Sequence, residues 1–272
     1  GYSNAFSAIF DSNLTSILET ENFDHFCFHY YPETMKDRVT GRNARENIQK
    51  IVDECLHFVQ NFDMEHDNLL FYGATGVGKT FLTHCIAKEL LESAHSVIYF
   101  TSFDLFEVLS TATFGKRYAE DEVLQQHSAI FDCDLLIIDD LGTEMTNTFV
   151  ASQLFLCINE RLMNKKSTII STNLSLESLR DLYSERIFSR ISSNFKMRKL
   201  IGKGGKITLW IPAELAYGRQ ARGKYILPNS ALKFEVELED VIPFVEETTP
   251  ATTDEAAAAT TQAANSALPV KK

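Results

Sequence analysis

Apolar residues follow two different patterns over the first two hundred positions. Ile48, Ile51 and Cys55 recur at helical spacing, whereas positions 135–138 form an unbroken apolar run, Leu-Leu-Ile-Ile. Such a run is typical of a strand that is buried on both faces of a parallel sheet. After a short helix and an aromatic segment within 1–35, the pattern predicts helices at 43–61, 80–92, 103–111, 119–131, 148–163 and 185–192, and strands at 68–72, 96–101, 134–140, 167–172 and 196–201.

This alternation of strands and helices predicts a doubly wound α/β fold. The pattern changes after residue 201, where a Gly- and Lys-rich break at 202–206 precedes two β-strands at 207–211 and 231–241. From residue 246 the chain is rich in Thr and Ala, and we expect it to be disordered. We therefore expect four parts: an N-terminal helical and aromatic segment (1–45), an α/β core (46–202), a small β-hairpin segment (203–245) and a disordered tail (246–272).

Composition limits the classes of protein to which this chain can belong. Its formal net charge of −11 argues against a protein that coats nucleic acid with its whole surface, but it leaves room for a local basic groove. No apolar run approaches 18 residues in length, so we expect no membrane span. An odd number of cysteines without a CxxC pair favours reduced thiols in a cytoplasmic protein over a disulfide framework; they are Cys27, Cys55, Cys85, Cys133 and Cys157.

The strongest chemical signal lies at 73–80, between a predicted strand and a predicted helix. Gly-Ala-Thr-Gly-Val-Gly-Lys-Thr matches the phosphate-binding loop (P-loop) pattern G-x-x-x-x-G-K-[ST] at every fixed position. Its glycines let backbone N–H groups point at phosphates, Lys79 supplies a positive charge, and the Thr80 hydroxyl can ligate magnesium. We therefore expect ATP and Mg²⁺ as cofactors, with ATP contacted by Gly73, Ala74, Thr75, Gly76, Val77, Gly78, Lys79, Thr80 and Phe81.

Two acids at the end of the 134–140 strand are candidates for the rest of the metal site. Asp139 is expected to reach magnesium, directly or through water, and Asp140 is expected to orient or deprotonate an attacking water. A carboxylate pair at a strand end can instead cap a helix. Its occurrence after a P-loop favours the catalytic interpretation.

Three further polar residues are candidates for catalysis. Asn173 follows the apolar strand at 167–172 and is expected to position water near the γ-phosphate, although Asn after a strand often serves turn chemistry instead. Arg186 and Arg190 are four residues apart and share a helix face. Either could reach the γ-phosphate in a neighbouring subunit, and the alternative is a surface salt-bridge face.

Four strings, in this order, resemble the DnaC/DnaI helicase loaders and their IstB transposition relatives: GATGVGKT, LLIIDDLG, IISTN and ERIFSRISSNFKMRKLIG. The resemblance covers about residues 23–202. It implies an AAA+ P-loop ATPase with a three-layer αβα core and a parallel sheet of order 5-1-4-3-2. It also implies that Asp139 and Asp140 are the Walker B acids, that Asn173 is sensor 1, and that Arg190 is the arginine finger.

The same resemblance implies partners. Loaders bind single-stranded DNA, form homo-oligomers with ATP and deliver the replicative helicase. The residues before Phe23 are too few for the N-terminal module with which loaders grip the helicase, so helicase binding stays open. Local basic residues such as Lys196, Arg198 and Lys199 are the expected DNA contacts.

A second resemblance begins where the pattern changes. The stretches at 205–218 and 226–241 contain IPAELAYG and LPNSALKFEVEL, which are similar to the last third of an FKBP-type peptidyl-prolyl isomerase. About 40 residues are too few to bury a complete core, so we expect a β-hairpin without isomerase activity. The candidate functions are therefore an ATP-hydrolysing helicase-loader-type replication factor, an IstB-like transposition ATPase, and a prolyl isomerase or chaperone.

Overall fold

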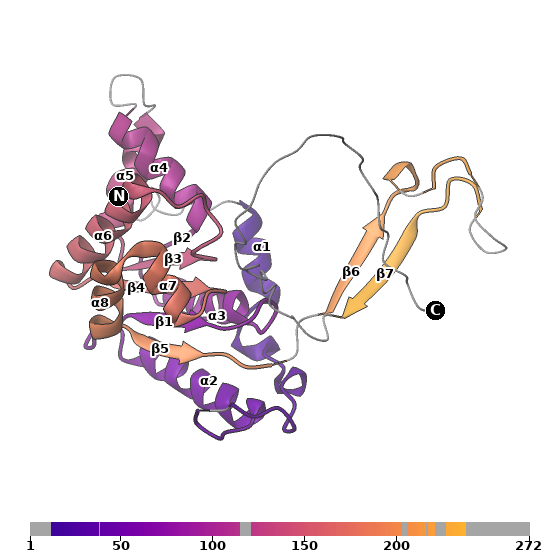
Figure 1. Cartoon of the computed structure of the whole chain (residues 1–272), viewed down its shortest axis with the longest axis horizontal. Coiled ribbons are helices and arrows are strands. Elements are labelled where there is room, and N and C mark those ends of the chain that lie inside the picture. The colour runs from indigo at the N-terminus through magenta and orange to yellow at the C-terminus, as the bar shows by residue number, and fades with distance from the viewer. Residues whose placement is uncertain are drawn as a thin grey trace, which may run out of the picture. The chain divides into compact units, whose positions relative to one another are not determined.

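A five-stranded parallel sheet forms the centre of the computed structural model, which describes residues 12–37, 39–114, 121–202, 206–215, 217–220 and 227–237 (Figure 1). The strand order is β2-β3-β4-β1-β5, which is the predicted 5-1-4-3-2 order read from the other edge. All four strand pairs are parallel. The strands are β1 (Leu69–Tyr72), β2 (Val97–Thr101), β3 (Leu135–Asp139), β4 (Ser167–Thr172) and β5 (Lys196–Lys199).

Helices cover both faces of this sheet, and each face has its own apolar core. On the first face, side chains of β1, β3 and β4 pack with three helices: α1 (Ser12–Thr20), α2 (Ala44–Gln60) and α3 (Lys79–Glu92). On the second face the alternate strand residues pack with five helices: α4 (Ser102–Phe114), α5 (Asp121–Asp132), α6 (Thr148–Met163), α7 (Leu176–Tyr183) and α8 (Glu185–Asn194). The three-layer αβα prediction is confirmed.

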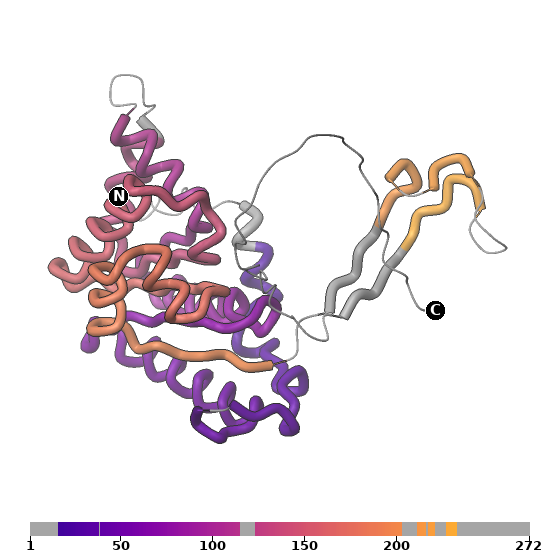
Figure 2. The backbone as a smooth tube through the Cα atoms, viewed as in Figure 1, coloured from indigo at the N-terminus to yellow at the C-terminus, as the bar shows by residue number. Residues whose placement is uncertain are grey.

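Local sequence explains where several helices begin. Asn43 caps α2 through a capping box, because its side chain accepts from the Glu46 N–H while the Glu46 carboxylate accepts from the Asn43 N–H. Asn147 caps α6 with a single bond, in which its side chain accepts from the Val150 N–H. Helix α2 then runs beside β5 (Figure 2), where the Asn47 side chain donates to the Lys199 carbonyl at 2.8 Å.

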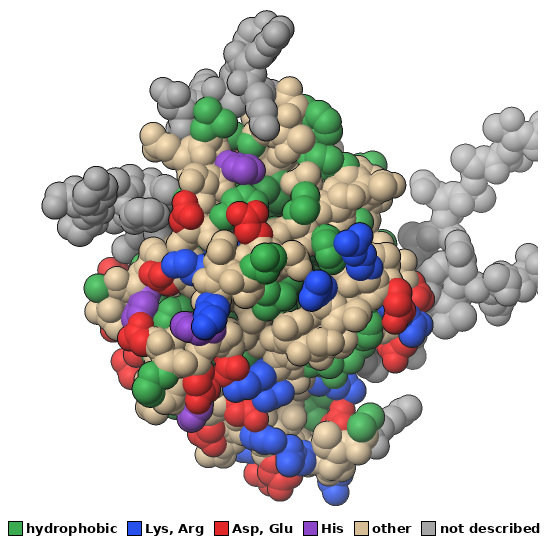
Figure 3. All heavy atoms as spheres, turned by 90° about the vertical axis from the view of Figure 1, so that its left-hand side faces the viewer, with side chains coloured by type: hydrophobic (Ala, Val, Ile, Leu, Met, Phe, Trp, Pro, Cys, Tyr) green, Lys and Arg blue, Asp and Glu red, His purple; other side chains and the backbone are tan. Residues whose placement is uncertain are grey.

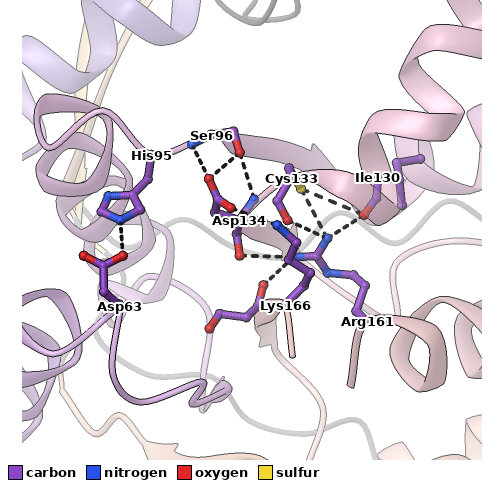
Figure 4. Close-up of polar contacts among 9 residues, drawn as sticks. Asp63, His95, Ser96, Ile130, Cys133, Asp134, Arg161 and Lys166 are labelled. Carbon is purple, nitrogen blue, oxygen red and sulfur yellow. Dashed lines mark hydrogen bonds and ion pairs between the residues drawn. The ribbon is translucent and has the colours of Figure 1, made fainter. Parts of the chain in front are cut away.

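The amino ends of β3 and β4 are joined by a fully buried arginine (Figure 4). The Arg161 guanidinium on α6 donates to the Ile130 carbonyl at 2.7 Å, the Ser167 carbonyl at 2.6 Å and the Thr168 hydroxyl at 3.0 Å. Beside it, the Asp134 carboxylate pairs with the Lys166 ammonium at 2.9 Å. These contacts tie α5, α6 and two strands together at the end of the sheet opposite the P-loop.

Two parts of the chain refine the sequence prediction. Helix α7 was not predicted, and it begins at Leu176, where the Ser175 side chain accepts from the Ser178 N–H. The predicted β-hairpin is present as β6 (Lys206–Ile211) antiparallel to β7 (Leu232–Glu237), with Leu209 opposite Phe234. The predicted disordered tail, 246–272, lies outside the described residues, and the four-part division of the chain stays a prediction.

Two other features bear on the sequence analysis. All five cysteines are free thiols, and only Cys27 is exposed. Within the described ranges, no helix combines the length and the apolar character that crossing a membrane requires.

Candidate functional site

The P-loop connects β1 to α3 and is held from outside by an aromatic side chain. Gly73 has φ +144°, and a Cβ there would lie 2.3 Å from the Leu200 carbonyl oxygen, so only glycine fits. Gly78 has φ +93°, and a Cβ there would lie 2.5 Å from the Tyr31 hydroxyl. The same hydroxyl donates to the Val77 carbonyl at 2.9 Å. The loop is therefore built without room for side chains at these two positions.

Lys79, the first residue of α3, is buried with its ammonium group inside the P-loop. Its Nζ donates to the Gly73 carbonyl at 2.9 Å, the Ala74 carbonyl at 2.8 Å and the Asn173 side-chain oxygen at 2.6 Å. Burial lowers the pKa of Lys79, and the nearby Asp140 and Asp139 carboxylates oppose that shift. Hydrogen-bond acceptors of the chain itself therefore hold the Lys79 ammonium inside the loop.

Thr80 and Asp139 meet at the carboxyl ends of β1 and β3. The Thr80 hydroxyl donates to Asp139 Oδ2 at 2.9 Å, and Asp139 is buried. A hydroxyl and a carboxylate are oxygen ligands of the kind that Mg²⁺ prefers. Among the described residues, no group of three or more His, Cys, Asp or Glu side chains is placed to hold a metal. A metal at Thr80 and Asp139 would therefore rely on phosphate oxygens and water for its other ligands, as Mg²⁺ commonly does.

Asp140 and Asn173 stand next to this pair. The Asn173 amide donates to Asp140 Oδ1 at 3.2 Å, while its oxygen accepts from Lys79. Burial raises the pKa of the Asp140 carboxyl, with the Asp139 charge adding to the shift. Asp140 has φ +53°, a left-handed conformation that Asp tolerates better than most residues. Asn173 therefore links the phosphate-binding lysine to the carboxylate that is the candidate general base.

The two candidate arginines on α8 are in different surroundings. The Arg186 guanidinium lies 4.1 Å from the centre of the Phe155 ring on α6, which holds it on its own chain. Arg190 is exposed, and its guanidinium forms no ion pair within the part of the chain that the structure describes. Among the described contacts, Arg190 is therefore the less constrained of the two side chains.

The structure thus brings together candidate residues that lie up to a hundred positions apart in the sequence. The P-loop residues, Thr80, Asp139, Asp140 and Asn173 converge at the carboxyl ends of β1, β3 and β4. Phe81 lies one residue further along α3, with its ring against Phe26 of the N-terminal aromatic segment. A cavity of about 750 Å³ opens beside Gly73, Ala74 and Asn173.

Three contacts at this site were not foreseen from the sequence. The Tyr99 hydroxyl donates to Asp139 Oδ2 at 2.6 Å, and the Ser171 hydroxyl donates to Asp139 Oδ1. Tyr31 supports the P-loop as described above. Ser171 lies within the IISTN string and the two tyrosines lie in no motif, but in all three cases only the folded chain reveals the contact.

Comparison with family models gives two matches. Residues 40–190 match the IstB-like ATP binding protein family, and residues 197–239 match the FKBP-type peptidyl-prolyl cis-trans isomerase family. Both resemblances drawn from the motifs are therefore confirmed. The second match begins inside β5, although β5 pairs with β1 in the parallel sheet.

Individual relatives agree with the first match. The replicative helicase loader DnaC of Escherichia coli (strain K12) is 25% identical over 146 residues, which cover 54% of this chain and 58% of that protein. The uncharacterized protein YdaV of the same strain is 27% identical over 153 residues, covering 56% and 57%. The chain thus spans little more than half the length of these curated relatives. A crystal structure of the DnaC helicase loader superimposes with a TM-score of 0.53 and 22% identity, over 68% of this chain and 99% of that one, which supports the fold.

Proposed function

Because this chain belongs to the family of IstB-like ATP-binding proteins, we propose that it binds ATP with Mg²⁺ in the P-loop and hydrolyses it as a replication factor of the helicase-loader type. The observation that carries this proposal is the convergence of Lys79, Thr80, Asp139, Asp140 and Asn173 at one edge of the sheet. Binding alone would not require Asp140 and Asn173. The contacts of Asn173 with both Asp140 and Lys79 favour hydrolysis.

The proposed mechanism assigns a task to each side chain. The P-loop N–H groups and the Lys79 ammonium bind the phosphates, and Lys79 shifts toward them from its present carbonyl partners. Thr80 and Asp139 would hold Mg²⁺, which would supply charge neutralisation at the phosphate oxygens. Asp140 accepts the proton of the attacking water, and Asn173 orients that water or Asp140 itself. When Lys79 turns to the phosphates, the Asn173 oxygen is freed to accept a hydrogen bond from the attacking water.

Replacing Asp140 with asparagine should lower the rate of ATP hydrolysis by about 10²-fold, because the amide cannot accept the proton of the water. ATP binding should change little, since Asp140 is not expected to contact the phosphates directly. Steady-state hydrolysis and equilibrium binding of a non-hydrolysable analogue measure the two quantities separately. Asp132→Asn, an exposed change at the end of α5, serves as the control. Hydrolysis at the wild-type rate in Asp140→Asn would contradict this assignment.

We also propose that copies of this chain form a homo-oligomer when ATP is bound. Arg190 is exposed on α8 and is proposed to reach the γ-phosphate bound by a neighbouring copy, with Arg186 as the second candidate. Hydrolysis per chain should then rise with protein concentration. A rate per chain that is constant across concentrations, in the presence and absence of single-stranded DNA, would count against the loader-type proposal.

Single-stranded DNA is the proposed stimulus of hydrolysis, and the similarity to helicase loaders supports it. The basic residues of β5 are less suited to this contact than the sequence suggested. Arg198 pairs with Glu54, Lys199 pairs with Asp37 at 2.8 Å, and Lys196 pairs with Asp67. On the face shown in Figure 3, acidic and basic side chains are interspersed. We therefore assign the DNA contact to no residue of β5, and helicase binding remains a proposal drawn from the relatives alone.

Two other functions have specific tests. An IstB-like transposition ATPase shares the same site, and a transposase gene beside the coding sequence would favour it. A prolyl isomerase is favoured only by the match at 197–239, whose regular elements among the described residues are the end of β5, the strands β6 and β7, and a short turn of 3₁₀ helix. A two-stranded hairpin is marginal by itself in water. We expect no isomerisation of a proline peptide above the uncatalysed rate.

A further inference from the structure

Tyr99, on the edge strand β2, contacts the carboxylate proposed to hold magnesium. It pairs in register with Ile137 of β3, and its hydroxyl reaches Asp139 Oδ2 at 2.6 Å. The ring packs against the apolar core of the first sheet face, on the side of α3.

The hydrogen bonds of Asp139 show what this contact does. A carboxylate has about four lone-pair sites. Three hydroxyls from three different elements fill three of them: Thr80 from α3 and Tyr99 from β2 on Oδ2, and Ser171 from β4 on Oδ1. The carboxylate is thereby fixed in one orientation with one acceptor site remaining. That remaining site is available to a metal ion or to a water bound to it.

We propose that Tyr99 is a positioning residue for the magnesium site, holding the Asp139 carboxylate in one orientation that leaves a lone pair of Oδ1 for the ion or for a water bound to it. This inference rests on the proposed function, because it assumes that Asp139 serves a metal. Hydrogen-bond partners behind metal ligands typically contribute 10- to 100-fold to metal affinity. The hydroxyl of Tyr99 acts through Asp139 and contacts neither the metal nor the phosphates.

The ring of Tyr99 is itself held in place by a buried histidine. His84 lies on α3, four residues after Thr80, and its ring centre is 5.1 Å from that of Tyr99. The His84 side chain is only 6% exposed, and its Nδ1 lies 2.6 Å from a carboxylate oxygen of Glu21. Thr80 and His84 therefore approach Asp139 and Tyr99 from the same face of α3. The segment that follows α1 is in this way connected to the metal site.

A Tyr99→Phe variant tests the inference, because it removes one oxygen and keeps the ring in the core. The measurement is equilibrium binding of a fluorescent non-hydrolysable ATP analogue, first in EDTA and then as a function of Mg²⁺ concentration. We expect the Mg²⁺ concentration at half-saturation to rise by about 10- to 100-fold. Binding of the analogue in EDTA and the melting temperature should stay close to those of the wild type.

Tyr31→Phe is the matched control, since it removes a tyrosine hydroxyl that supports the P-loop through the Val77 carbonyl. It should weaken analogue binding equally with and without Mg²⁺. An unchanged Mg²⁺ requirement in Tyr99→Phe, with Mg²⁺-dependent binding in the wild type, overturns the inference and leaves the proposed function intact. A wild type that binds no analogue, or binds it without regard to Mg²⁺, overturns the proposed magnesium site and the inference with it.

His84→Ala provides a second test if Tyr99→Phe does not fold. This change keeps the Tyr99 hydroxyl but removes the imidazole ring that packs against the Tyr99 ring. The Mg²⁺ requirement should shift in the same direction, again without a change of binding in EDTA. A folded His84→Ala protein with the wild-type Mg²⁺ requirement also counts against the inference.

Discussion

Lys79→Ala is expected to lower the affinity for ATP by about 10³-fold, which corresponds to about 4 kcal/mol. The lysine of a P-loop contacts the β- and γ-phosphates, and each charge-assisted hydrogen bond contributes about 1.5–3 kcal/mol. In this chain the ammonium is already inside the loop, held by the Gly73 and Ala74 carbonyls and by Asn173. Little side-chain ordering remains to be done on binding, but Lys79 exchanges these acceptors for phosphate oxygens, so the net loss of affinity should be smaller than the full contribution of two or three charge-assisted bonds. Titration with a fluorescent ATP analogue in Mg²⁺ measures the loss.

The control for this variant lies on the same helix. Lys88 lies further along α3, and its ammonium pairs with Glu92 at 3.8 Å. Lys88→Ala removes this ammonium, and the affinity for ATP should remain within about twofold of the wild-type value. Equal affinities of the wild type and Lys79→Ala would contradict the central assignment of the P-loop. A loss of the same size in both variants would point to a defect of α3 and would likewise remove the support for a specific role of Lys79.

Much of the fold follows from local sequence, because the sheet is buried on both faces. The continuous apolar strands leave little ambiguity, and α6 and β4 begin and end where the pattern places them, at Thr148–Met163 and Ser167–Thr172. The parallel order was implied by the resemblance to AAA+ proteins. Helix α7 was not predicted because it has only eight residues. Ser175 followed by Leu176 and Leu179 is nevertheless a helix start signal with helical spacing.

The candidate site divides in a similar way between local and long-range information. The P-loop and the Asp139–Asp140 pair can be recognised in the sequence because their chemistry requires particular residue types at a fixed spacing. The contacts of Tyr99 with Asp139 and of Tyr31 with Val77 join residues 40 and 46 positions apart. Nothing in the sequence around either tyrosine distinguishes it from an ordinary buried aromatic residue. Such contacts depend on the register of β2 with β3 and on the packing of the N-terminal segment.

The pairing of β5 shows how the fold changes the meaning of charges. Lys196, Arg198 and Lys199 look like a basic cluster in the sequence, and a cluster of that kind suggests nucleic-acid binding. In the folded chain their partners come from α2 and from the loops before α2 and β1, including Asp37, Glu54 and Asp67. The Lys199–Asp37 pair is close, at 2.8 Å, and its hydrogen bond is the chief cause of the lowered pKa of the Asp37 carboxyl. A run of basic residues therefore supports a DNA contact only when the fold shows that those residues are not already paired with acidic side chains of the same chain.

Arg161→Met is expected to destabilise the fold by about 3–5 kcal/mol. Methionine fills a similar volume, but it cannot donate to the carbonyls of Ile130 and Ser167, which then stay buried without the partner they have now. Because Arg161 is fully buried, water has no easy access to replace the guanidinium. The melting temperature should fall by roughly 10 °C, given about 2–4 °C for each kcal/mol in a domain of this size. Chemical denaturation should show an earlier midpoint with an unchanged slope.

Arg180→Met makes the same chemical change at an exposed position of α7 and separates this effect from a general loss of charge. Arg180 pairs at the surface with Asp181 at 3.4 Å and Glu185 at 3.8 Å, and such pairs contribute about 0–1 kcal/mol. Its melting temperature should stay within a few degrees of the wild type. Nearly equal melting temperatures for the two variants would mean that the carbonyls around Arg161 find other partners. The end of the sheet opposite the P-loop would then be held by apolar packing and by the Asp134–Lys166 pair rather than by the buried guanidinium.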